Sequence, residues 1–393
     1  MSSRARTAAA DAPRRTAVLA LASLLALGGC RDAVGPTGPP ADLDAVESWA
    51  PAAPFGVMTR NLYIGGSTAP LLSLDFGDLP AVLAATNAFW AEVQASDIPG
   101  RTAALADEIV RQQPEVVGLQ EAVGFVVLDG TFTPIGQLDI LQRLVLEIEA
   151  RGGGYDLVAV QENTSSALPL SVSAAGVDRW LQFTDRIAML VREDVEMEGP
   201  AESDNYAATF MAGPVELKRG WIRARVEHGG VDWTVVTTHL EVQGLAPIQA
   251  LQAGELLSSV LPEDENSIVM GDLNSDAEAA PGAPSWTPTY RTLLDAGYVD
   301  AWEQAHPGAR PVGFTCCHAD DLRNPTASFD QRIDFVLMRS QQGHGGDWRL
   351  NGSVHAEVVG DEAGDRTSGD LWPSDHGGLV AEIRLAPGIF ANR

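Results

Sequence analysis

Basic residues are scarce in this chain of 393 residues. Lys and Arg together number 26, against 53 Asp and Glu, and the formal net charge at pH 7 is −27. Nucleic acid is a polyanion whose non-specific binders usually present basic surface, so this balance argues against a protein that scans or stores duplex DNA. It does not exclude an enzyme with a locally cationic cleft.

Cysteine is also rare, with three in the whole chain. Cys316 and Cys317 are adjacent, and Cys30 lies near the N-terminus. Adjacent cysteines suit a vicinal disulfide or two buried thiols better than a framework of disulfide staples. Export would permit oxidation, and the sequence leaves both states open.

The apolar run near the N-terminus, AVLALASLLALGG, is too short to span a bilayer comfortably. It follows four arginines and ends in small residues before Cys30, which predicts an export signal over residues 1–29. The string LALGGC resembles a bacterial lipoprotein signal, in which the cysteine becomes the lipidated first residue; the alternative is an ordinary signal peptide with an incidental cysteine. Cleavage would remove four Arg and one Asp and leave a formal charge of −30. We expect an exported protein, lipid-anchored to the bacterial cell envelope and facing the periplasm or the cell surface, or otherwise secreted.

The rest of the chain divides simply. Residues 30–54 are rich in Pro, Ala and acidic residues and lack periodicity, which predicts a linker between a lipid anchor and a folded body. No later linker of this kind and no internal repeat is found. We therefore predict one domain over residues 55–387, followed by a short tail at 388–393.

Strand-like and helical patterns alternate through that domain. Strands are predicted for FGVMTRNLYI, EVVGLQEA, YDLVAVQE, DRIAMLVRE, NSIVMGDLN, QRIDFVLMR, GGLVAEIRL and WIRARVEHGGVDWTVVTTHLE, with a turn at His228-Gly229-Gly230. Helices are predicted for AALADEIVRQQ and PIQALQAGELLSSVL, and a helix and turn for YRTLLDAGYVDAWEQAH. This pattern favours an α/β or α+β domain built on stacked sheets with helices outside.

Several predicted strands end in an acid, an amide or an imidazole. Strand ends are where such folds place binding loops, so these groups are expected to converge. Each alone has a plainer reading as a turn former, a cap or a salt-bridge partner, such as Asp334 with Arg332. Together they form the inventory of a hydrolase that uses a hard metal ion: Asn61, Glu121, His239, Asp272, Asn274, Asp334, Asp375 and His376.

The order of these strand ends resembles the endonuclease/exonuclease/phosphatase superfamily, which includes deoxyribonuclease-type nucleases, abasic-site endonucleases, neutral sphingomyelinases and inositol-polyphosphate phosphatases. The motifs TRNLYIGG, VVGLQEA, TTHLEV, VMGDLNSD, QRIDFVL and SDHGGLVAEI follow the family's order from Phe55 to Leu385. The resemblance implies an α+β fold of four layers, α/β/β/α, with two mixed sheets face to face and helices outside. It also implies a divalent-metal phosphoesterase site at one edge.

The resemblance further implies the metal site. Glu121 matches the principal ligand, with Asn61 beside it, and Asp375 matches the carboxylate that supports the ion or its water shell. Mg²⁺ suits these oxygen ligands, with Mn²⁺ or Ca²⁺ as alternatives. One departure is Arg60, which stands before Asn61 where many members carry Trp and puts the local phosphate environment in doubt.

The catalytic residues implied by the resemblance surround that metal site. His376 matches the catalytic histidine, Asp334 the acid that orients it, and Asp272 the acid that places the attacking water. Asn274 matches the amide that holds a phosphate oxygen, and His239 the histidine that contacts the phosphate or assists the leaving group. The nucleophile is expected to be water, because no activated Ser or Cys motif is visible. Which of Asp272 and His376 takes the water's proton stays open.

Substrate specificity is expected to come from loops, because phosphodiesters and phosphomonoesters share this core. Residues 313–330 lead into the Asp334 strand, and Arg323 and His318 there are candidate substrate contacts, or else ordinary loop residues. The first hypothesis is a phosphodiesterase, nuclease or sphingomyelinase-like, held at the membrane by its lipid and monomeric. The alternatives are an inositol-phosphate type phosphomonoesterase, disfavoured by the scarcity of Lys and Arg in the motif loops, and a catalytically silent surface binding protein.

Overall fold

Two β-sheets form the centre of the structure, a computed structural model that describes residues 53–262, 265–308, 312–340 and 352–385. The predicted export signal, Cys30, most of the linker at 30–54 and the tail at 388–393 lie outside the described residues, so they stay predictions. Within the described ranges, every helix is too short or too polar to cross a membrane.

The first sheet has eight strands and contains both ends of the described chain. β1 lies between β2, to which it is parallel, and β17, to which it is antiparallel. β6 pairs with β2 and β3 along one edge and with β5 along the other. The strands are β16 (Gly352–Val359), β17 (Gly378–Leu385), β1 (Phe55–Asn61), β2 (Val116–Gln120), β6 (Gly176–Arg192), β3 (Gly124–Asp129), β4 (Pro134–Asp139) and β5 (Tyr155–Ser173).

The second sheet has seven strands. Its centre is a hairpin of β11 and β12 whose turn residues Gly229 and Gly230 have φ of 62° and 80°, the backbone that a tight two-residue turn requires. The predicted turn is therefore confirmed. The strands are β14 (Val299–Asp300), β15 (Asp334–Arg339), β13 (Ser267–Asp272), β12 (Val231–His239), β11 (Gly220–His228), β7 (Glu196–Met197) and β8 (Glu202–Asn205); β9 (Phe210–Ala212) and β10 (Val215–Leu217) form a separate small pair.

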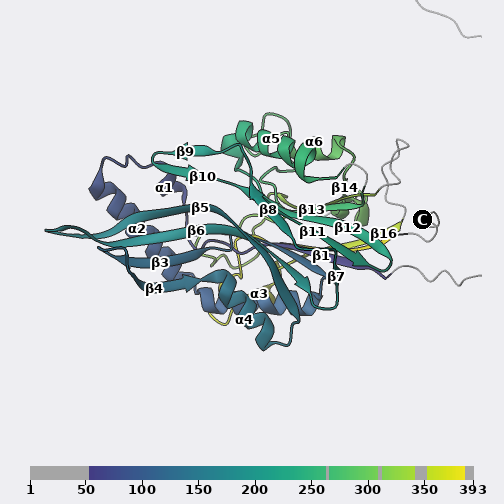
Figure 1. Cartoon of the computed structure of the whole chain (residues 1–393), viewed down its shortest axis with the longest axis horizontal. Coiled ribbons are helices and arrows are strands. Elements are labelled where there is room, and N and C mark those ends of the chain that lie inside the picture. The colour runs from purple at the N-terminus through teal and green to yellow at the C-terminus, as the bar shows by residue number, and fades with distance from the viewer. Residues whose placement is uncertain (1–52, 263–264, 309–311, 341–351, 386–393) are drawn as a thin grey trace, which may run out of the picture. The chain divides into compact units, whose positions relative to one another are not determined.

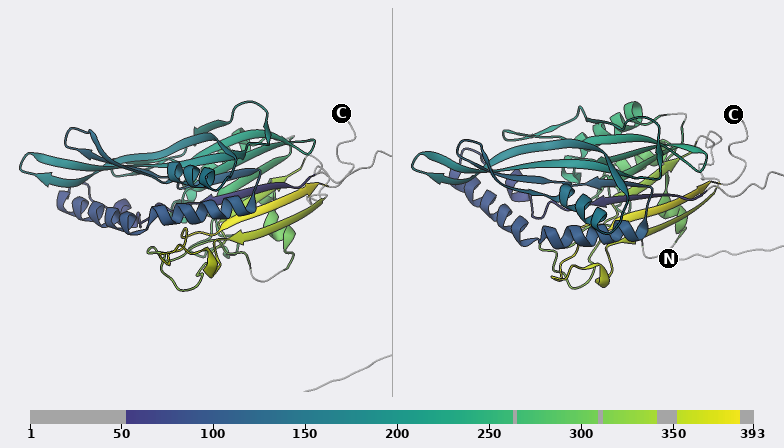
Figure 2. Two further views of the ribbon diagram at one scale, coloured as in Figure 1. Left: turned by 90° about the horizontal axis from the view of Figure 1, so that it is seen from below. Right: turned by 60° about the horizontal axis from the view of Figure 1, so that its bottom comes forward.

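Helices cover the outer faces of both sheets (Figure 1). α2 (Leu79–Ala95) and α3 (Ile98–Gln112) lie end to end along the first sheet with α4 (Ile140–Ala150) beside them, as Figure 2 shows, and α5 (Ala246–Glu255) and α6 (Thr289–Asp295) cover the second. α3 begins at the Asp97 cap and stops one residue before Gln113, whose φ is 49°, and Pro114 follows. The remaining short elements are α1 (Ala69–Leu72), α7 (Ala301–Ala305), η1 (Gln243–Leu245), η2 (Leu256–Val260) and η4 (Ala363–Asp365).

Three apolar clusters hold these layers together. One lies between the two sheets and includes Val57, Met189, Val235 and Met270. The second packs the first sheet against α2, α3 and α4, and the third packs the other sheet against α5 and α6. The predicted four-layer α/β/β/α sandwich is confirmed.

The β5–β6 ribbon is the largest feature that the sequence did not predict. The two strands have 19 and 17 residues, and their outer parts extend to the left in Figure 1. The predicted runs YDLVAVQE and DRIAMLVRE are only their inner ends. The outer part is rich in Ser and small residues and its pairing is interrupted by register shifts, so it lacks a clear strand pattern.

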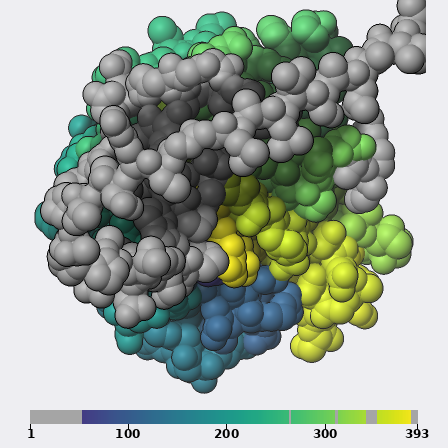
Figure 3. Space-filling model, turned by 90° about the vertical axis from the view of Figure 1, so that its right-hand side faces the viewer, coloured from purple at the N-terminus to yellow at the C-terminus, as the bar shows by residue number. Residues whose placement is uncertain are grey.

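Strand direction brings the predicted polar groups to one edge. β1 and β2 end together at Asn61 and Gln120, and β12 and β13 end together at His239 and Asp272. β15 is antiparallel to β13 and therefore starts there, with Asp334 paired to Asp272. β17 also starts at this edge. Figure 3 shows the face of the molecule at the opposite end of β17, where yellow C-terminal residues lie between blue and green segments.

Candidate active site

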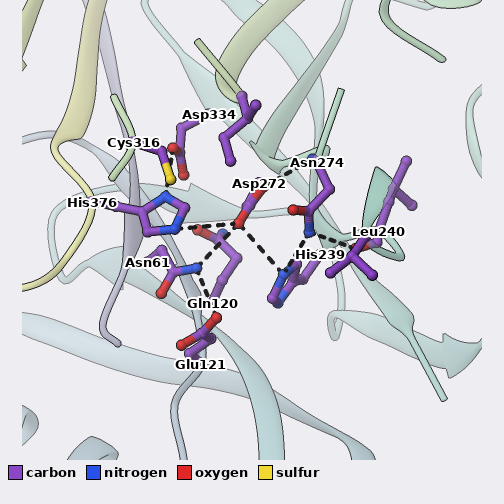
Figure 4. A network of polar contacts seen from close by, with 12 residues as sticks. Asn61, Gln120, Glu121, His239, Leu240, Asp272, Asn274, Cys316, Asp334 and His376 are labelled. Atoms are coloured by element: carbon purple, nitrogen blue, oxygen red, sulfur yellow. Dashed lines mark hydrogen bonds and ion pairs between the residues drawn. The ribbon is translucent and has the colours of Figure 1, made fainter. Parts of the chain in front are cut away.

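The strand ends surround a cavity of about 190 Å³. Figure 4 shows the predicted side chains other than Asp375, from both sheets, pointing toward one another there. Five of the eight predicted motif residues line the cavity: Glu121, His239, Asp272, Asn274 and His376. Asp185, Arg219, Cys316 and Cys317 also line it and were not predicted as site residues.

His376 and Asp334 form a buried pair at this edge. The Asp334 Oδ2 atom lies 2.8 Å from His376 Nδ1, and the two side chains are 0% and 7% exposed. Burial alone would lower the pKa of His376, but the Asp334 and Asp375 carboxylates raise it well above its ordinary value. The imidazole is therefore held as a cation at neutral pH.

Asp272 lies at the centre of the polar network. Its Oδ1 accepts a hydrogen bond from the Asn274 backbone at 2.9 Å, and its Oδ2 accepts one from the Asn61 amide at 3.1 Å. Oδ2 is also 3.4 Å from His239 Nε2 and 3.9 Å from His376 Nε2. Burial, followed by the negative charge of Asp334, raises the pKa of Asp272 to about 7. This carboxylate is therefore suited to exchange a proton near neutral pH.

The backbone at two of these residues is unusual. Glu121 and Asn274 have φ of 53° and 48°, which is uncommon outside glycine and costs free energy that the surrounding structure must offset. Gly271 in the VMGDLN motif has φ of 151°, and an added Cβ would lie 2.0 Å from the Thr238 carbonyl oxygen. The glycine therefore allows β13 to approach β12 where Asp272 enters the cavity.

Glu121, Asn61 and Asp375 were predicted to hold a metal ion. Glu121 Oε2 accepts from the Ile64 backbone at 2.8 Å and Oε1 from the Asn61 amide at 3.2 Å. Burial raises the pKa of Glu121, with Asp185 adding to it. Burial also raises the pKa of Asp375 to about 6, with His376 opposing and Glu121 reinforcing the shift.

The carboxyl groups of Glu121 and Asp375 are buried, and the charge of Glu121 adds to the rise in the pKa of Asp375. Carboxylate oxygens are ligands that a hard divalent cation prefers, and such an ion would supply the positive charge that these buried groups lack. Asp375 does not line the cavity itself. The Asn61 amide turns its nitrogen toward Glu121 and Asp272, while its oxygen accepts from the Tyr63 backbone at 3.0 Å. Ligation by Asn61 would therefore require the amide to turn over.

The opposite wall of the cavity carries groups suited to a phosphate. The Asn274 amide donates to the Leu240 carbonyl at 3.0 Å and lies 3.2 Å from His239 Nε2. Arg219 lies 3.1 Å from His239 Nδ1 and 3.2 Å from Glu241 Oε1. Burial, and then the charge of Arg219, lower the pKa of His239, so this imidazole is neutral.

Arg219 and Asp185 are site residues that the sequence reasoning missed. Neither belongs to one of the family motifs, although Asp185 is the first residue of the predicted strand DRIAMLVRE. The turn at Gly229-Gly230 fixes a register in which Trp221 pairs with Thr238, so Arg219, two residues earlier, lies beside the end of β12. This hairpin register is the signal that would have placed Arg219 next to His239.

Arg60, which stands where many members of the family were expected to carry Trp, points away from the cavity. Its guanidinium pairs with Glu108, with Nε 2.9 Å from Oε2, and it donates to the His376 carbonyl oxygen. Both Arg60 and Glu108 are buried. Arg60 therefore supports the main chain of His376, the candidate catalytic histidine, and does not reach the cavity.

The structure does not bring Arg323 and His318 into the cavity. Arg323 is exposed on its loop. His318 is buried, with its ring centroid 4.1 Å from that of Phe329 and 4.4 Å from that of Trp372. Their predicted role as substrate contacts gains no support from this placement.

Comparisons with known proteins agree with this architecture. The sequence profile described as the Endonuclease/Exonuclease/phosphatase family matches residues 132–376. No curated protein matches the chain.

Solved structures show the likeness at low identity. The endonuclease/exonuclease/phosphatase from Beutenbergia cavernae is 20% identical over 85% of this chain and 72% of its own, with a TM-score of 0.51. A family protein from Bacteroides thetaiotaomicron is 14% identical over 85% and 95%, with a TM-score of 0.50. Truncated TDP2 from Caenorhabditis elegans is 18% identical over 84% and 97%, with a TM-score of 0.46. Likeness at these identities concerns the fold alone.

Proposed function

Because the chain belongs to the Endonuclease/Exonuclease/phosphatase family, whose members hydrolyse phosphate esters, we propose that it is a divalent-metal-dependent phosphodiesterase. The observation that carries the proposal is the single cavity around which Glu121, Asp272 and the His376–Asp334 pair converge. The two cysteines beside it are tied in a disulfide, so the described walls of the cavity offer no thiol nucleophile. We take water to be the attacking group, because Asp272 lines the cavity and its raised pKa suits it to accept the water's proton.

We assign the metal site to Glu121 and Asp375, with Asn61 beside them and Mg²⁺ as the expected ion; Mn²⁺ and Ca²⁺ are the alternatives. When bound, such an ion supplies positive charge to the phosphate oxygens. The raised pKa values of Glu121 and Asp375 support this assignment, because a nearby cation would favour the ionised form of both carboxylates.

We assign the proton transfers to Asp272 and His376. Asp272 takes a proton from the attacking water as the new bond from oxygen to phosphorus forms, because its pKa of about 7 lets it act as a base near neutral pH. The His376 imidazolium faces the developing negative charge and donates a proton to the leaving oxygen as its bond to phosphorus breaks. Asp334 keeps that imidazole charged and oriented.

We assign phosphate binding to Asn274, His239 and Arg219. The Asn274 amide and the neutral His239 provide hydrogen bonds, and Arg219 provides a buried positive charge. Among the described residues that line the cavity, Arg219 is the only Lys or Arg. One guanidinium suits a single phosphodiester better than a polyphosphate, which disfavours the inositol-phosphate type of phosphomonoesterase.

A panel of phosphate esters tests this proposal. Plasmid DNA, RNA, sphingomyelin, bis-p-nitrophenyl phosphate and inositol phosphates are each offered with Mg²⁺, Mn²⁺, Ca²⁺ or a chelator. We expect hydrolysis of at least one diester with a divalent ion and none with the chelator. Activity that survives chelation would reject the metal dependence, and cleavage of monoesters alone would favour the alternative. Binding to every ester without turnover would favour a silent binding protein.

We also propose that the mature protein is anchored through lipid on Cys30 and exported. The order of arginines, apolar run and small residues before this cysteine supports the proposal. Metabolic labelling with a fatty acid should label the wild-type protein but not Cys30→Ser. Mature protein that starts after Cys30 and carries no label would refute the anchor.

A further inference from the structure

The Cys316–Cys317 disulfide has no part in the proposed reaction, yet it lies against the catalytic candidate. The two sulfurs and a ring nitrogen of His376 all lie within 4.8 Å of one another. Figure 4 shows the Cys316 sulfur beside the imidazole. Cys316 is buried, and both cysteines line the cavity.

The backbone around this disulfide connects two separate segments of the chain. We call residues 315–318 the cysteine strip. Cys316 forms β-bridges with Gln331 on one side and His376 on the other. The Gly377 backbone donates to the Thr315 carbonyl oxygen at 2.7 Å, and the Cys316 backbone donates to the Gln331 carbonyl oxygen at 3.0 Å. The strip therefore ties the segment that enters β15 to the segment that enters β17.

The same strip contacts both members of the buried pair. The Thr315 hydroxyl oxygen accepts hydrogen bonds from the backbones of Asp334 at 3.1 Å and Ile333 at 3.3 Å. Asp334 is thus fixed through Thr315, and His376 through its bridge to Cys316. A movement of the strip would change the position of His376 relative to Asp334.

A disulfide between neighbouring residues limits how the strip can move. It removes the independent rotation of the two cysteine side chains, and opening it restores that freedom. Reduction by a dithiol breaks the Sγ–Sγ bond: two electrons and two protons pass to the pair and leave two thiols, while the dithiol closes to its own disulfide.

We propose that the Cys316–Cys317 disulfide is a positioning element that holds His376 against Asp334, so that its reduction lowers turnover. This inference rests on the proposed phosphodiesterase function. It adds that a dithiol reductant lowers turnover, an effect that the proposed reaction chemistry alone does not require. The cysteines act through His376 and take no part in bond making or breaking.

The kinetic test uses full-length protein carrying Cys30→Ser, because only the adjacent pair can then supply thiols. The protein is reduced with dithiothreitol and desalted without oxygen, its thiols are counted, and bis-p-nitrophenyl phosphate hydrolysis is measured with Mg²⁺. We expect kcat to fall at least tenfold, KM to stay within twofold, and kcat to recover after reoxidation. Cys316→Ser/Cys317→Ser should have the kcat of the reduced protein and ignore dithiothreitol. If this double variant does not fold, the reversible reduction alone decides.

A second readout does not depend on activity. The proton on His376 Nδ1 that faces Asp334 is followed by NMR and identified by its loss in His376→Gln. We expect its resonance to shift or disappear on reduction. If the resonance responds but no ester is hydrolysed by the oxidised protein, the proposed function fails and the positioning inference stands. Two free thiols with unchanged kcat and resonance would overturn the inference, and so would a change confined to KM, which indicates direct contact with substrate.

Discussion

Replacement of Asp334 by Asn removes one charge and changes the shape of the pair very little. The Asp334 carboxylate lies 2.8 Å from His376 Nδ1, and its side chain has no exposed surface. Because the site is buried, water screens this interaction poorly. An amide in the same place carries no negative charge to stabilise the imidazolium. Only one of its two terminal atoms is an oxygen that can accept a hydrogen bond from Nδ1.

The size of the loss follows from what each group does. General acid–base catalysis contributes roughly 10² to 10⁴ in rate, so we expect His376→Ala to lower kcat/KM by about 10³, or about 4 kcal/mol. Asp334→Asn should lower it by at least about 10², or about 3 kcal/mol, because the imidazole remains but is neutral or misplaced. If Asp334 acts only through His376, the double variant should be no slower than His376→Ala.

The assay is a double-mutant cycle on bis-p-nitrophenyl phosphate with Mg²⁺, followed by release of p-nitrophenolate. Asp300→Asn is the matched control: Asp300 is also a buried carboxylate, and it accepts from Tyr290 at 2.8 Å and from Arg332 outside the cavity. We expect the control to keep kcat within twofold. Losses that multiply in the double variant would refute the pair, because Asp334 would then act without His376.

Three further predictions concern two other residues of the site and His318, which lies outside the cavity. Glu121→Gln should lower kcat/KM at least about 100-fold and raise the Mg²⁺ concentration for half-maximal rate, because an amide is a neutral and weaker ligand; a titration curve like that of the wild type would contradict this. Arg219→Lys should lower kcat/KM about tenfold, since an ammonium lacks the planar fork that contacts both His239 and Glu241, and unchanged steady-state kinetics would remove Arg219 from the site. Burial, and then the positive charges of Arg60 and His376, lower the pKa of His318 from 6.5 to about 4. The neutral imidazole therefore contributes its full stability above pH 6.5. This stability is lost as the pH falls toward 4, and the free energy of unfolding drops by up to about 3 kcal/mol. Urea unfolding across this range should show a smaller loss for His318→Phe, and parallel curves would contradict the assignment.

The positions of the motif residues could be predicted because each follows from chain direction. An apolar run that stops at Asn61, His239 or Asp272 is a strand, and strands that run the same way end at the same edge. The sequence therefore identified which groups would meet. It did not show that the Asn61 amide turns its nitrogen toward the carboxylates, because an amide side chain has no preferred orientation until its partners are placed.

Other features depend on partners far away in the sequence. Arg60 is buried because Glu108 on α3 lies behind β1, and nothing in the residues around Arg60 indicates this pairing. The buried position of His318 likewise depends on Trp372, which follows it by more than fifty residues. Loops such as 313–330 lack the periodicity that places side chains in strands, so their direction cannot be read from the sequence.

The net charge of −27 does not describe the electrostatics of the site, because the charged groups there are buried and hold fixed positions. Arg60 and Arg101 lie behind the cavity and donate to the backbone carbonyls of His376 and Pro373. These two arginines therefore stabilise the loop that carries Asp375 and His376, while Arg219 alone among the described Lys and Arg residues reaches the cavity. The acidic chain can hence present a local positive charge to one phosphate without a basic surface, and in the proposed function His376 and the proposed cation would supply the remaining charge compensation.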